Sequence, residues 1–558
     1  MKDIKKLISE MTLEEKLGQL FMEYMEDKYN VLPHIKDALD SGRIGSIIYF
    51  SGCNVEDGLQ FGELSAKLQA EAGKRGRGIP LVLAIDQEGG QLTSVRKLAT
   101  ISPGNMAIGA TDSIKDAENI GRMTGRQMKV MNVSVNLAPV VDSACNLDVP
   151  IVSNRVFGSD PRRVGAMGAA YVKGCQAEGV AACLKHFPGQ ANSEKDTHWH
   201  LDVIDKPLAQ LEKNELLPFK MGIDAGVDSL LTIHAIFPAL DKKLPATLSE
   251  KIINGYLRKT LGFKKLIISD DVYMKAIKNH YGLDEAAYLA IKAGVDIVMG
   301  AADTKTMHKY CIEQVRKGKL SMDQVNESVA RVLEFKQKYC TAIATPAQAK
   351  KVLITNAAAD EKVSQTVADH AITVIRNNAG VLPLKPGKKD KIVVIQPGNI
   401  RLEMSDAVNL YDKNNLVEEI KKRHDNVREV VIGLEPNKEE IISILDTCFI
   451  SDIIIVGTQH VYRHPAQKTM MDDIIKLAES KNKKLITVAL RSTTDLAYYP
   501  EAQTHLVSYG NWACLNKALV KVMFGEIEAV GKLPVPIKGL YKTGYSYKGK
   551  MKKPAKKK

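Results

Sequence analysis

The chain of 558 residues is poor in aromatic residues, which make up 6% of it, and it lacks long hydrophobic runs. No stretch approaches the roughly 18 uninterrupted apolar residues of a transmembrane helix, which excludes a membrane span of that kind. The N-terminus is an amphipathic helical pattern without the apolar block and cleavage site of a secretory segment, so a cytoplasmic location is expected unless such a segment has been removed. With 45% apolar residues, the composition excludes a disordered, collagen-like or coiled-coil chain. A length of 558 residues is too great for one ordinary domain and predicts two.

Paired cysteine motifs are also absent. No two of the eight cysteines have CxxC spacing, which argues against a zinc knuckle or a redox dithiol. Unpaired thiols in apolar surroundings pack as small hydrophobic side chains and fit a reducing compartment. The cysteines are Cys53, Cys145, Cys175, Cys183, Cys311, Cys340, Cys448 and Cys514.

Acidic residues are outnumbered, with 65 against 78 Lys and Arg, and the net charge is +13. Seven of these positive charges lie in the tail after residue 547, which holds no acidic residue, so the rest of the chain carries +6. A terminal lysine cluster is usually solvated and disordered. Because no recognition motif accompanies it, nucleic-acid binding is not predicted.

Short apolar runs alternate with amphipathic stretches of helical length from residue 44 to about 300. A parallel sheet covered by helices produces this pattern, and seven repeats predict a TIM-type (β/α) barrel, with an open doubly wound sheet as the alternative. No eighth strand is evident. The seven runs are 44–50, 80–86, 133–142, 180–187, 228–237, 265–271 and 295–301.

A second α/β pattern follows a connector that contains a proline and no strong apolar period. Its five short runs are too few for a barrel and predict a smaller, mostly parallel α/β sandwich. The predicted bounds are 1–345 for the barrel, 346–371 for a connecting helix, 372–540 for the second domain and 541–558 for a disordered tail. The five runs are 391–397, 428–433, 451–459, 483–490 and 505–510.

Chemically capable side chains follow the apolar runs of the predicted barrel. The carboxyl ends of barrel strands share one face, where active sites are built, so we expect these residues to converge on one pocket. The ordinary alternative for each of them is a cap of the following helix. They are Asp86, Glu88, Asp142, Lys185, His186, His234, Asp270 and Asp271.

The segment KHFPGQANSEKDTHWH, residues 185–200, is the most distinctive of the chain. Lys185 and His186 end a predicted strand, and a proline and a glycine then force a turn into a polar loop. In this loop Asp196 can hold the imidazole of His198 in one orientation and favour its protonated form, giving a proton donor near neutral pH. The alternative is a solvated loop histidine.

Two further segments present carboxylates. Asp270 ends the strand of LIISDD, where it could attack an electrophilic carbon, while Asp271 points differently because successive strand residues alternate sides. Asp86 in AIDQEGG is suited to accept hydrogen bonds from sugar hydroxyls, and the two following glycines allow a backbone to approach a ligand closely. The histidines and carboxylates could also bind a metal, but no HxH ends a strand. Phosphate-binding glycine motifs are absent, so nucleotide chemistry is not predicted.

Together these segments resemble glycoside hydrolase family 3, and within it the β-N-acetylglucosaminidase (NagZ-like) branch. The matching pieces are MTLEEKLGQLF, AIDQEGG, NRVFGSDP, KHFPG with the downstream DTH, and ISDDVYMKAI, while HAITVIRNNAGVLPLKP and GKLPVPI are similar to the two ends of the family's C-terminal sandwich domain. The resemblance implies that Asp270 is the nucleophile and that His198, with Asp196, is the general acid/base. It also implies no metal or organic cofactor. The residues it implies for substrate binding are Asp86, Arg155, Lys185 and His186.

The chain departs from the family pattern at two places. Gln190 and Ala191 replace the His-Gly pair of the usual KHFPGHG, which could alter how the loop brings the catalytic histidine in. Ser94 stands where the family commonly has an arginine after DQEGG, and whether Arg96 substitutes for it stays open. The loop 457–467 is a second-domain candidate to line the cleft, with an ordinary solvated loop as the alternative.

The resemblance implies a retaining exo-β-N-acetylglucosaminidase that releases terminal N-acetylglucosamine from muropeptides or chitooligosaccharides, so a small carbohydrate is the expected partner. A phosphorylase on the same scaffold is an alternative, since a histidine acid/base would not repel phosphate as a glutamate would. A non-catalytic carbohydrate-binding protein and a metal-dependent amide hydrolase are further alternatives. The oligomeric state is not predicted.

Overall fold

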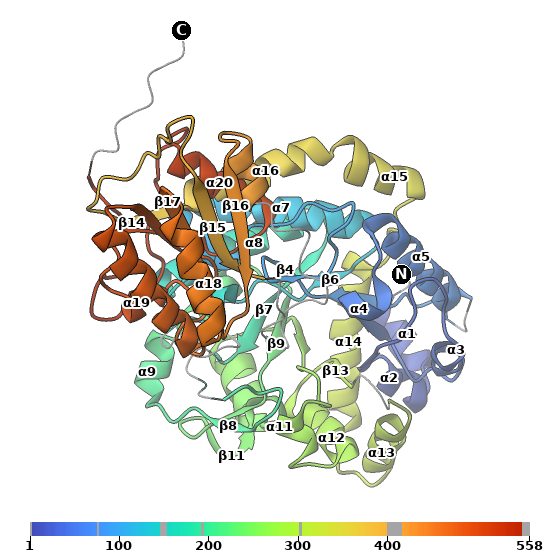
Figure 1. The fold of residues 1–558 in the computed structure, drawn as a ribbon. Helices are drawn as coiled ribbons and strands as arrows, with labels where there is room; N and C mark the ends of the chain where they lie inside the picture. Colours follow the sequence, from blue (N-terminus) through green and yellow to red (C-terminus); the bar gives the residue numbers. More distant parts are fainter. Residues whose placement is uncertain are drawn as a thin grey trace.

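The structure, a computed structural model, describes residues 3–74, 77–144, 153–190, 193, 195–300, 304–398 and 416–549. Within these ranges the first half of the chain forms a barrel of eight parallel strands in the order β12-β9-β7-β6-β3-β2-β1-β13, surrounded by helices (Figure 1). A parallel bridge between Ile268 and Ile297 joins the two ends of this order. The predicted TIM-type barrel is therefore confirmed, and the open doubly wound alternative is wrong.

Seven of the eight strands coincide with the predicted apolar runs. The eighth is β1 (Phe21–Glu23), which pairs with β2 on one side and β13 on the other. It has three residues and lies directly behind helix α2 (Leu13–Gly18), so its apolar side chains continue the helical pattern of the N-terminus. The other strands are β2 (Ser46–Tyr49), β3 (Val82–Ile85), β6 (Val135–Asn136), β7 (Ala181–Phe187), β9 (Ser229–Thr232), β12 (Leu266–Ile268) and β13 (Val298–Met299).

Helices cover the outside of the barrel, so its strands are buried on both faces and read as continuous apolar runs. Ile47 of β2, Leu83 of β3 and Ile267 of β12 are fully buried. The larger covering helices are α5 (Gly58–Gly73), α7 (Ile114–Val130), α8 (Pro161–Ala177), α10 (Leu216–Asp224), α12 (Leu283–Ala293), α13 (Thr304–Arg316) and α14 (Met322–Tyr339), with a π-helical segment at Lys251–Thr260.

The second half contains a six-stranded sheet in the order β14-β19-β18-β17-β15-β16. Five strands match the predicted runs and are parallel, and β14 (Thr373–Asn377) pairs antiparallel with β19 at one edge. Helices α18 (Lys438–Phe449) and α19 (Pro465–Ser480) lie on one face of the sheet and α20 (Ala513–Met523) on the other (Figure 1). The predicted sandwich is confirmed. The parallel strands are β15 (Ile392–Pro397), β16 (Val427–Ile432), β17 (Ile453–Thr458), β18 (Lys484–Ala489) and β19 (Thr504–Val507).

The segment predicted as a connector is helical. It contains α15 (Pro346–Lys350), a π-helical turn at Lys351–Thr355 and α16 (Ala357–Ala371), which runs beside α7 (Figure 1). Gln127 of α7 donates to Oδ2 of Asp360 in α16 at 2.8 Å, which anchors the connector on the barrel. The exact domain bounds stay a prediction.

The C-terminal part of the described chain packs on the second half. Tyr541, Tyr545 and Tyr547 pack against the core of the second half, so residues 541–549 are folded, although the disordered tail was expected to begin at 541; the lysines from 550 onward lie outside the described residues. The seven described cysteines are unpaired, and Cys145 lies outside the described residues. Among the described helices, none has the length and apolar character needed to cross a membrane.

Candidate active site

A cavity of about 510 Å³ opens where the barrel strands end. Six of the seven predicted site residues line it, and the seventh, Asp196, bonds to one of them. The expected convergence of side chains from distant parts of the chain is therefore what the fold produces. The six lining residues are Asp86, Arg155, Lys185, His186, His198 and Asp270.

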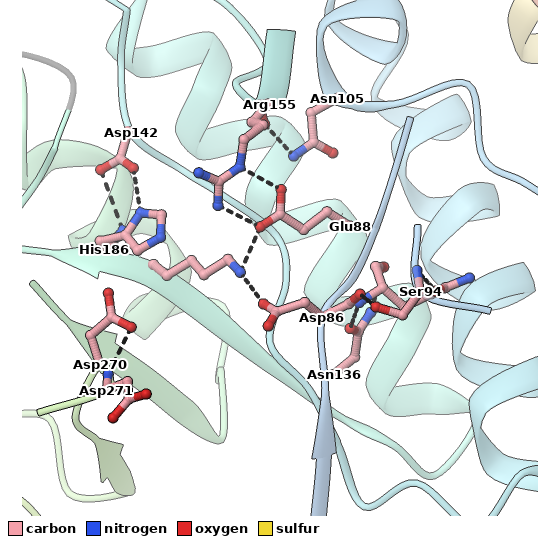
Figure 2. Close-up of polar contacts among 12 residues, drawn as sticks. Asp86, Glu88, Ser94, Asn105, Asn136, Asp142, Arg155, His186, Asp270 and Asp271 are labelled. Atoms are coloured by element: carbon pink, nitrogen blue, oxygen red, sulfur yellow. Dashed lines mark hydrogen bonds and ion pairs between the residues drawn. The ribbon is translucent and has the colours of Figure 1, made fainter. Parts of the chain in front are cut away.

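A buried ion network forms one wall of the cavity (Figure 2). Glu88 accepts two hydrogen bonds from Arg155, at 2.9 Å from Nε and 2.7 Å from Nη2, and its Oε1 lies 2.6 Å from Nζ of Lys185. Burial alone would raise the pKa of Glu88, but the two cations outweigh it and hold the pKa at about 2. Glu88 is thus a fixed negative charge that orients both cations.

Lys185 in turn holds the carboxylate of Asp86. Its Nζ lies 2.5 Å from Oδ1 of Asp86, whose side chain is 26% exposed at the cavity. Burial would lower the pKa of Lys185, but Asp86 and Glu88 raise it above its usual value, so the ammonium stays charged. A carboxylate with one oxygen held by a cation keeps its other lone pairs for ligand hydroxyls.

The position of the expected family arginine does not add a cation to this wall. Ser94 lines the cavity, and its hydroxyl donates to the backbone carbonyl of Asp86 at 2.6 Å. Arg96 donates from Nε to the carbonyl of Thr93 at 2.8 Å and is not among the described lining residues. Neither position 94 nor position 96 thus adds a cation to the described lining of the cavity.

Asp142 orients His186 through two hydrogen bonds (Figure 2). Its Oδ2 accepts from Nδ1 of the His186 ring at 2.8 Å, and its Oδ1 accepts from the His186 backbone N–H at 3.3 Å. Because Nδ1 is occupied, Nε2 is the ring nitrogen available to a ligand.

Asp196 and His198 form the predicted pair. Oδ1 of Asp196 accepts from Nδ1 of His198 at 2.8 Å and from the His198 backbone N–H at 2.9 Å. Burial would raise the pKa of Asp196, but its hydrogen bonds and charge interaction with His198 lower it. An ionised Asp196 therefore holds the ring in one orientation, leaving Nε2 of His198 for the cavity.

Asp270 lies just past the end of β12, where the charges of three histidines, His234, His186 and His198, act on it. Burial would raise its pKa, but nearby histidines, His234 foremost, lower it below its ordinary value. His234 is itself fixed, with Nδ1 2.9 Å from Oγ1 of Thr247 and Nε2 3.0 Å from the carbonyl of Asp271. The outcome is an ionised, oriented carboxylate at the cavity wall.

The two glycines after Glu88 serve packing within the protein. Both have positive φ, and a Cβ on Gly89 would lie 2.6 Å from Cβ of Ser102, while one on Gly90 would lie 3.1 Å from the ring of Trp512. Neither is among the described lining residues, so the close backbone approach expected to a ligand is instead an approach to neighbouring parts of the chain.

The second half of the chain supplies none of the described lining residues, which lie between positions 49 and 299. His460 of the loop 457–467 is buried near Met106 and Arg491, where the two halves meet. The hypothesis that this loop lines the cleft is therefore not supported by the described residues.

Sequence reasoning missed the rim of the cavity. Trp199, Tyr273 and Lys275 line the cavity, and Nζ of Lys275 lies 4.3 Å from the ring centre of Trp199. Only their proximity in sequence to His198 and Asp270 could have indicated this rim. Among the described residues, no group of three or more His, Cys, Asp and Glu side chains is arranged so that it could bind a metal ion.

Comparison with known proteins identifies the family. The model described as "Glycosyl hydrolase family 3 N terminal domain" matches residues 12–335. The chain belongs to glycosyl hydrolase family 3, which confirms the resemblance seen in its motifs and the expected class of enzyme, a glycoside hydrolase.

The relatives of the chain include beta-hexosaminidases. Beta-hexosaminidase A of Pseudoalteromonas piscicida is 27% identical over 549 residues, covering 90% of this chain and 91% of the relative. The beta-hexosaminidase of Nitrosomonas eutropha is 32% identical over 262 residues, 46% of this chain and 73% of the relative. Among solved structures, a glycoside hydrolase family 3 beta-N-acetylglucosaminidase from Paenibacillus sp. has 29% identity and a TM-score of 0.87, covering 94% of this chain and 99% of that one.

A beta-glucoside phosphorylase shares the fold at 22% identity, with a TM-score of 0.81 over 96% of each chain. Similarity at this level concerns the architecture alone. It shows that this barrel and sandwich occur with both hydrolytic and phosphorolytic chemistry.

Proposed function

We propose that the protein is a retaining exo-β-N-acetylglucosaminidase that removes terminal N-acetylglucosamine from muropeptides or chitooligosaccharides. The observation that carries this proposal is the joint presence, on one cavity, of an ionised Asp270 and the hydrogen-bonded pair of Asp196 and His198. The beta-hexosaminidase names of the relatives and the 29% identical beta-N-acetylglucosaminidase structure agree with it.

The proposed reaction has two steps. Asp270 attacks the anomeric carbon while Nε2 of His198 gives a proton to the departing oxygen, so the glycosidic bond breaks as the aspartyl–sugar bond forms. His198, now neutral, takes a proton from water, and the resulting hydroxide equivalent displaces Asp270. Two displacements at the same carbon retain its configuration.

The ion network is proposed to bind the sugar. Asp86, held by Lys185, accepts hydrogen bonds from adjacent hydroxyls, and Arg155 and His186 donate to ring substituents. A ligand bound in this way presents its anomeric carbon to Asp270. None of these steps requires a cofactor.

The test is hydrolysis of 4-nitrophenyl N-acetyl-β-D-glucosaminide, with the glucoside lacking the acetamido group as the specificity control. Asp270→Asn is expected to lose at least about a thousandfold in kcat, because the nucleophile is gone. His198→Ala is expected to lose activity on chitobiose while sparing substrates with activated leaving groups. A wild-type enzyme without turnover, with or without phosphate, contradicts the proposal.

The same assay separates hydrolysis from phosphorolysis. A neutral imidazole carries no negative charge that would exclude phosphate, so phosphate could replace water as the acceptor in the second step. Release of free N-acetylglucosamine in phosphate buffer supports the hydrolase, and N-acetylglucosamine 1-phosphate supports the phosphorylase.

A further inference from the structure

The loop that carries the acid/base pair begins at Gln190, directly behind β7. Gln190 is buried, with 2% of its surface exposed, and so is Thr197, with 1% exposed. Nε2 of Gln190 donates to Oγ1 of Thr197 at 3.1 Å. Thr197 lies between Asp196 and His198 in the sequence, so this bond holds the residue that links the two members of the pair.

The other end of Gln190 is tied to the barrel. Its backbone N–H donates to Oδ1 of Asp142 at 2.7 Å, and the same carboxylate orients the ring of His186. A continuous chain of hydrogen bonds therefore runs from the strand end through Asp142 and Gln190 to Thr197. All three side chains are buried, where a hydrogen bond is little weakened by competition from water.

We propose that Gln190 is a positioning residue for the general acid. Its side-chain amide fixes Thr197, and thereby the Asp196–His198 pair, relative to Asp142 and the bound sugar. This inference rests on the proposed function, since it presumes that His198 transfers the proton. The same role explains why glutamine can stand at position 190, where the usual KHFPGHG pattern has histidine. Both side chains bring an N–H donor to this position.

Other contacts hold the loop at different points and define what Gln190 adds. The backbone N–H of Lys275 donates to the carbonyl of His198 at 3.0 Å, and Asp202 accepts from the hydroxyl of Ser193 at 2.6 Å. Because these bonds do not involve Gln190, we expect them to persist when its amide is removed. The expected defect is therefore misplacement of the acid by a fraction of an ångström, with the loop still in place.

The test uses the full-length chain and a series of N-acetyl-β-D-glucosaminides whose leaving groups differ in acidity. In Gln190→Met, which keeps length but has no donor, kcat/KM is expected to fall about tenfold for chitobiose and less than about twofold for the 2,4-dinitrophenyl glycoside, which needs no proton. Thr197→Val removes the acceptor and should give the same pattern. The double variant should be no worse than either single variant, because both remove the same bond.

Three controls separate positioning from loss of structure. Thr197→Ser and Gln190→His each retain a polar group and should restore most of the chitobiose activity. Gln467→Met makes the same chemical change at a fully buried glutamine of the second half, bonded to Gln459, and should leave the leaving-group dependence unchanged. Equal losses across all leaving groups, or no loss in either Gln190→Met or Thr197→Val, overturn the inference.

The outcome is distinguishable from failure of the proposed function. If His198→Ala shows no dependence on the leaving group, His198 is not the acid, and both proposals fall. If His198→Ala behaves as expected while Gln190→Met matches the wild-type enzyme, the positioning role alone is wrong.

Discussion

Arg491 donates a hydrogen bond from Nη2 to Oε1 of Gln91 at 2.9 Å, across the contact between the two halves of the chain. Gln91 directly follows the loop of Asp86 and Glu88. Trp512 acts beside it, with its ring against Gly90 and its indole N–H donating to the carbonyl of Pro103 at 3.0 Å. The second half therefore supports the segment that follows Asp86 and Glu88, while supplying none of the described cavity residues.

Replacing Arg491 should accordingly weaken substrate binding more than chemistry. In Arg491→Met the loop loses a buried support, so KM is expected to rise several-fold while kcat stays within about twofold of wild type. Steady-state kinetics on 4-nitrophenyl N-acetyl-β-D-glucosaminide measures both constants. Arg428→Met, on the exposed edge strand β16, is the matched control and should change neither. A fall in kcat at unchanged KM would contradict the supporting role.

The low pKa of Asp270 predicts activity that persists into acid. Burial opposes ionisation of Asp270, but interactions with nearby histidines, His234 foremost, outweigh it and hold its pKa below the ordinary aspartate value of about 3.9. The acid limb of kcat/KM for an activated substrate should then fall below about pH 4, with activity lost as the pH drops through the lowered pKa. An acid limb near pH 6 that persists in His198→Ala would contradict this assignment.

Glu88→Gln should destabilise the barrel, since it leaves two buried cations without their shared anion. Breaking a buried pair by removing one partner costs about 3 kcal/mol, to be measured from urea unfolding at pH 7. Because the pKa of Glu88 is lowered to about 2, its stabilisation is complete above its ordinary pKa and is lost as the pH falls from there through 2. The gap between wild type and variant should therefore narrow at acid pH. Glu327→Gln, at an exposed ion pair with Arg331, should cause no measurable change.

Lys336 gives the opposite dependence on pH. It is fully buried, with Nζ 2.6 Å from Oε1 of Gln19, and burial lowers its pKa to about 7. Between pH 7 and its ordinary pKa the unfolded chain binds more protons than the folded one, so stability should rise with pH by up to about 1.4 kcal/mol per unit. Lys336→Met should abolish this rise in urea titrations, whereas Lys319→Met, on the surface, should keep it. The same pH dependence in the wild type and in Lys336→Met would show that Lys336 stays charged in the fold.

The sequence predicted most of the barrel because buried parallel strands read as apolar runs and their ends hold polar residues. Asp270, Lys185 and His186 could be found from that pattern alone, while the roles of the site residues came from the family resemblance. Strand β1 could not be found, since three residues behind a helix carry no periodic signal. Antiparallel β14 was missed as well, because Val374 and Ile375 follow helix α16 closely and their apolar side chains continue its pattern.

Contacts between distant segments were beyond reach for a different reason. The bond from Arg491 to Gln91 joins residues 400 positions apart, and neither side chain belongs to a recognisable motif. Gly89 and Gly90 are a second example. The sequence shows that another group approaches the backbone closely at these glycines, but it does not show which group. Only the fold reveals Trp512 and Ser102 beside them.

Strand β1 contributes no described residue to the cavity, but it is part of the barrel that holds the cavity together. Met25 follows the end of β1 by two positions. A polypeptide that began at Met25 would still contain every described residue of the cavity. It would nevertheless lack the strand between β2 and β13, and β13 carries Met299 into the cavity wall. Internal initiation or N-terminal trimming at this point would thus leave every described cavity residue in the chain and remove one strand of the barrel.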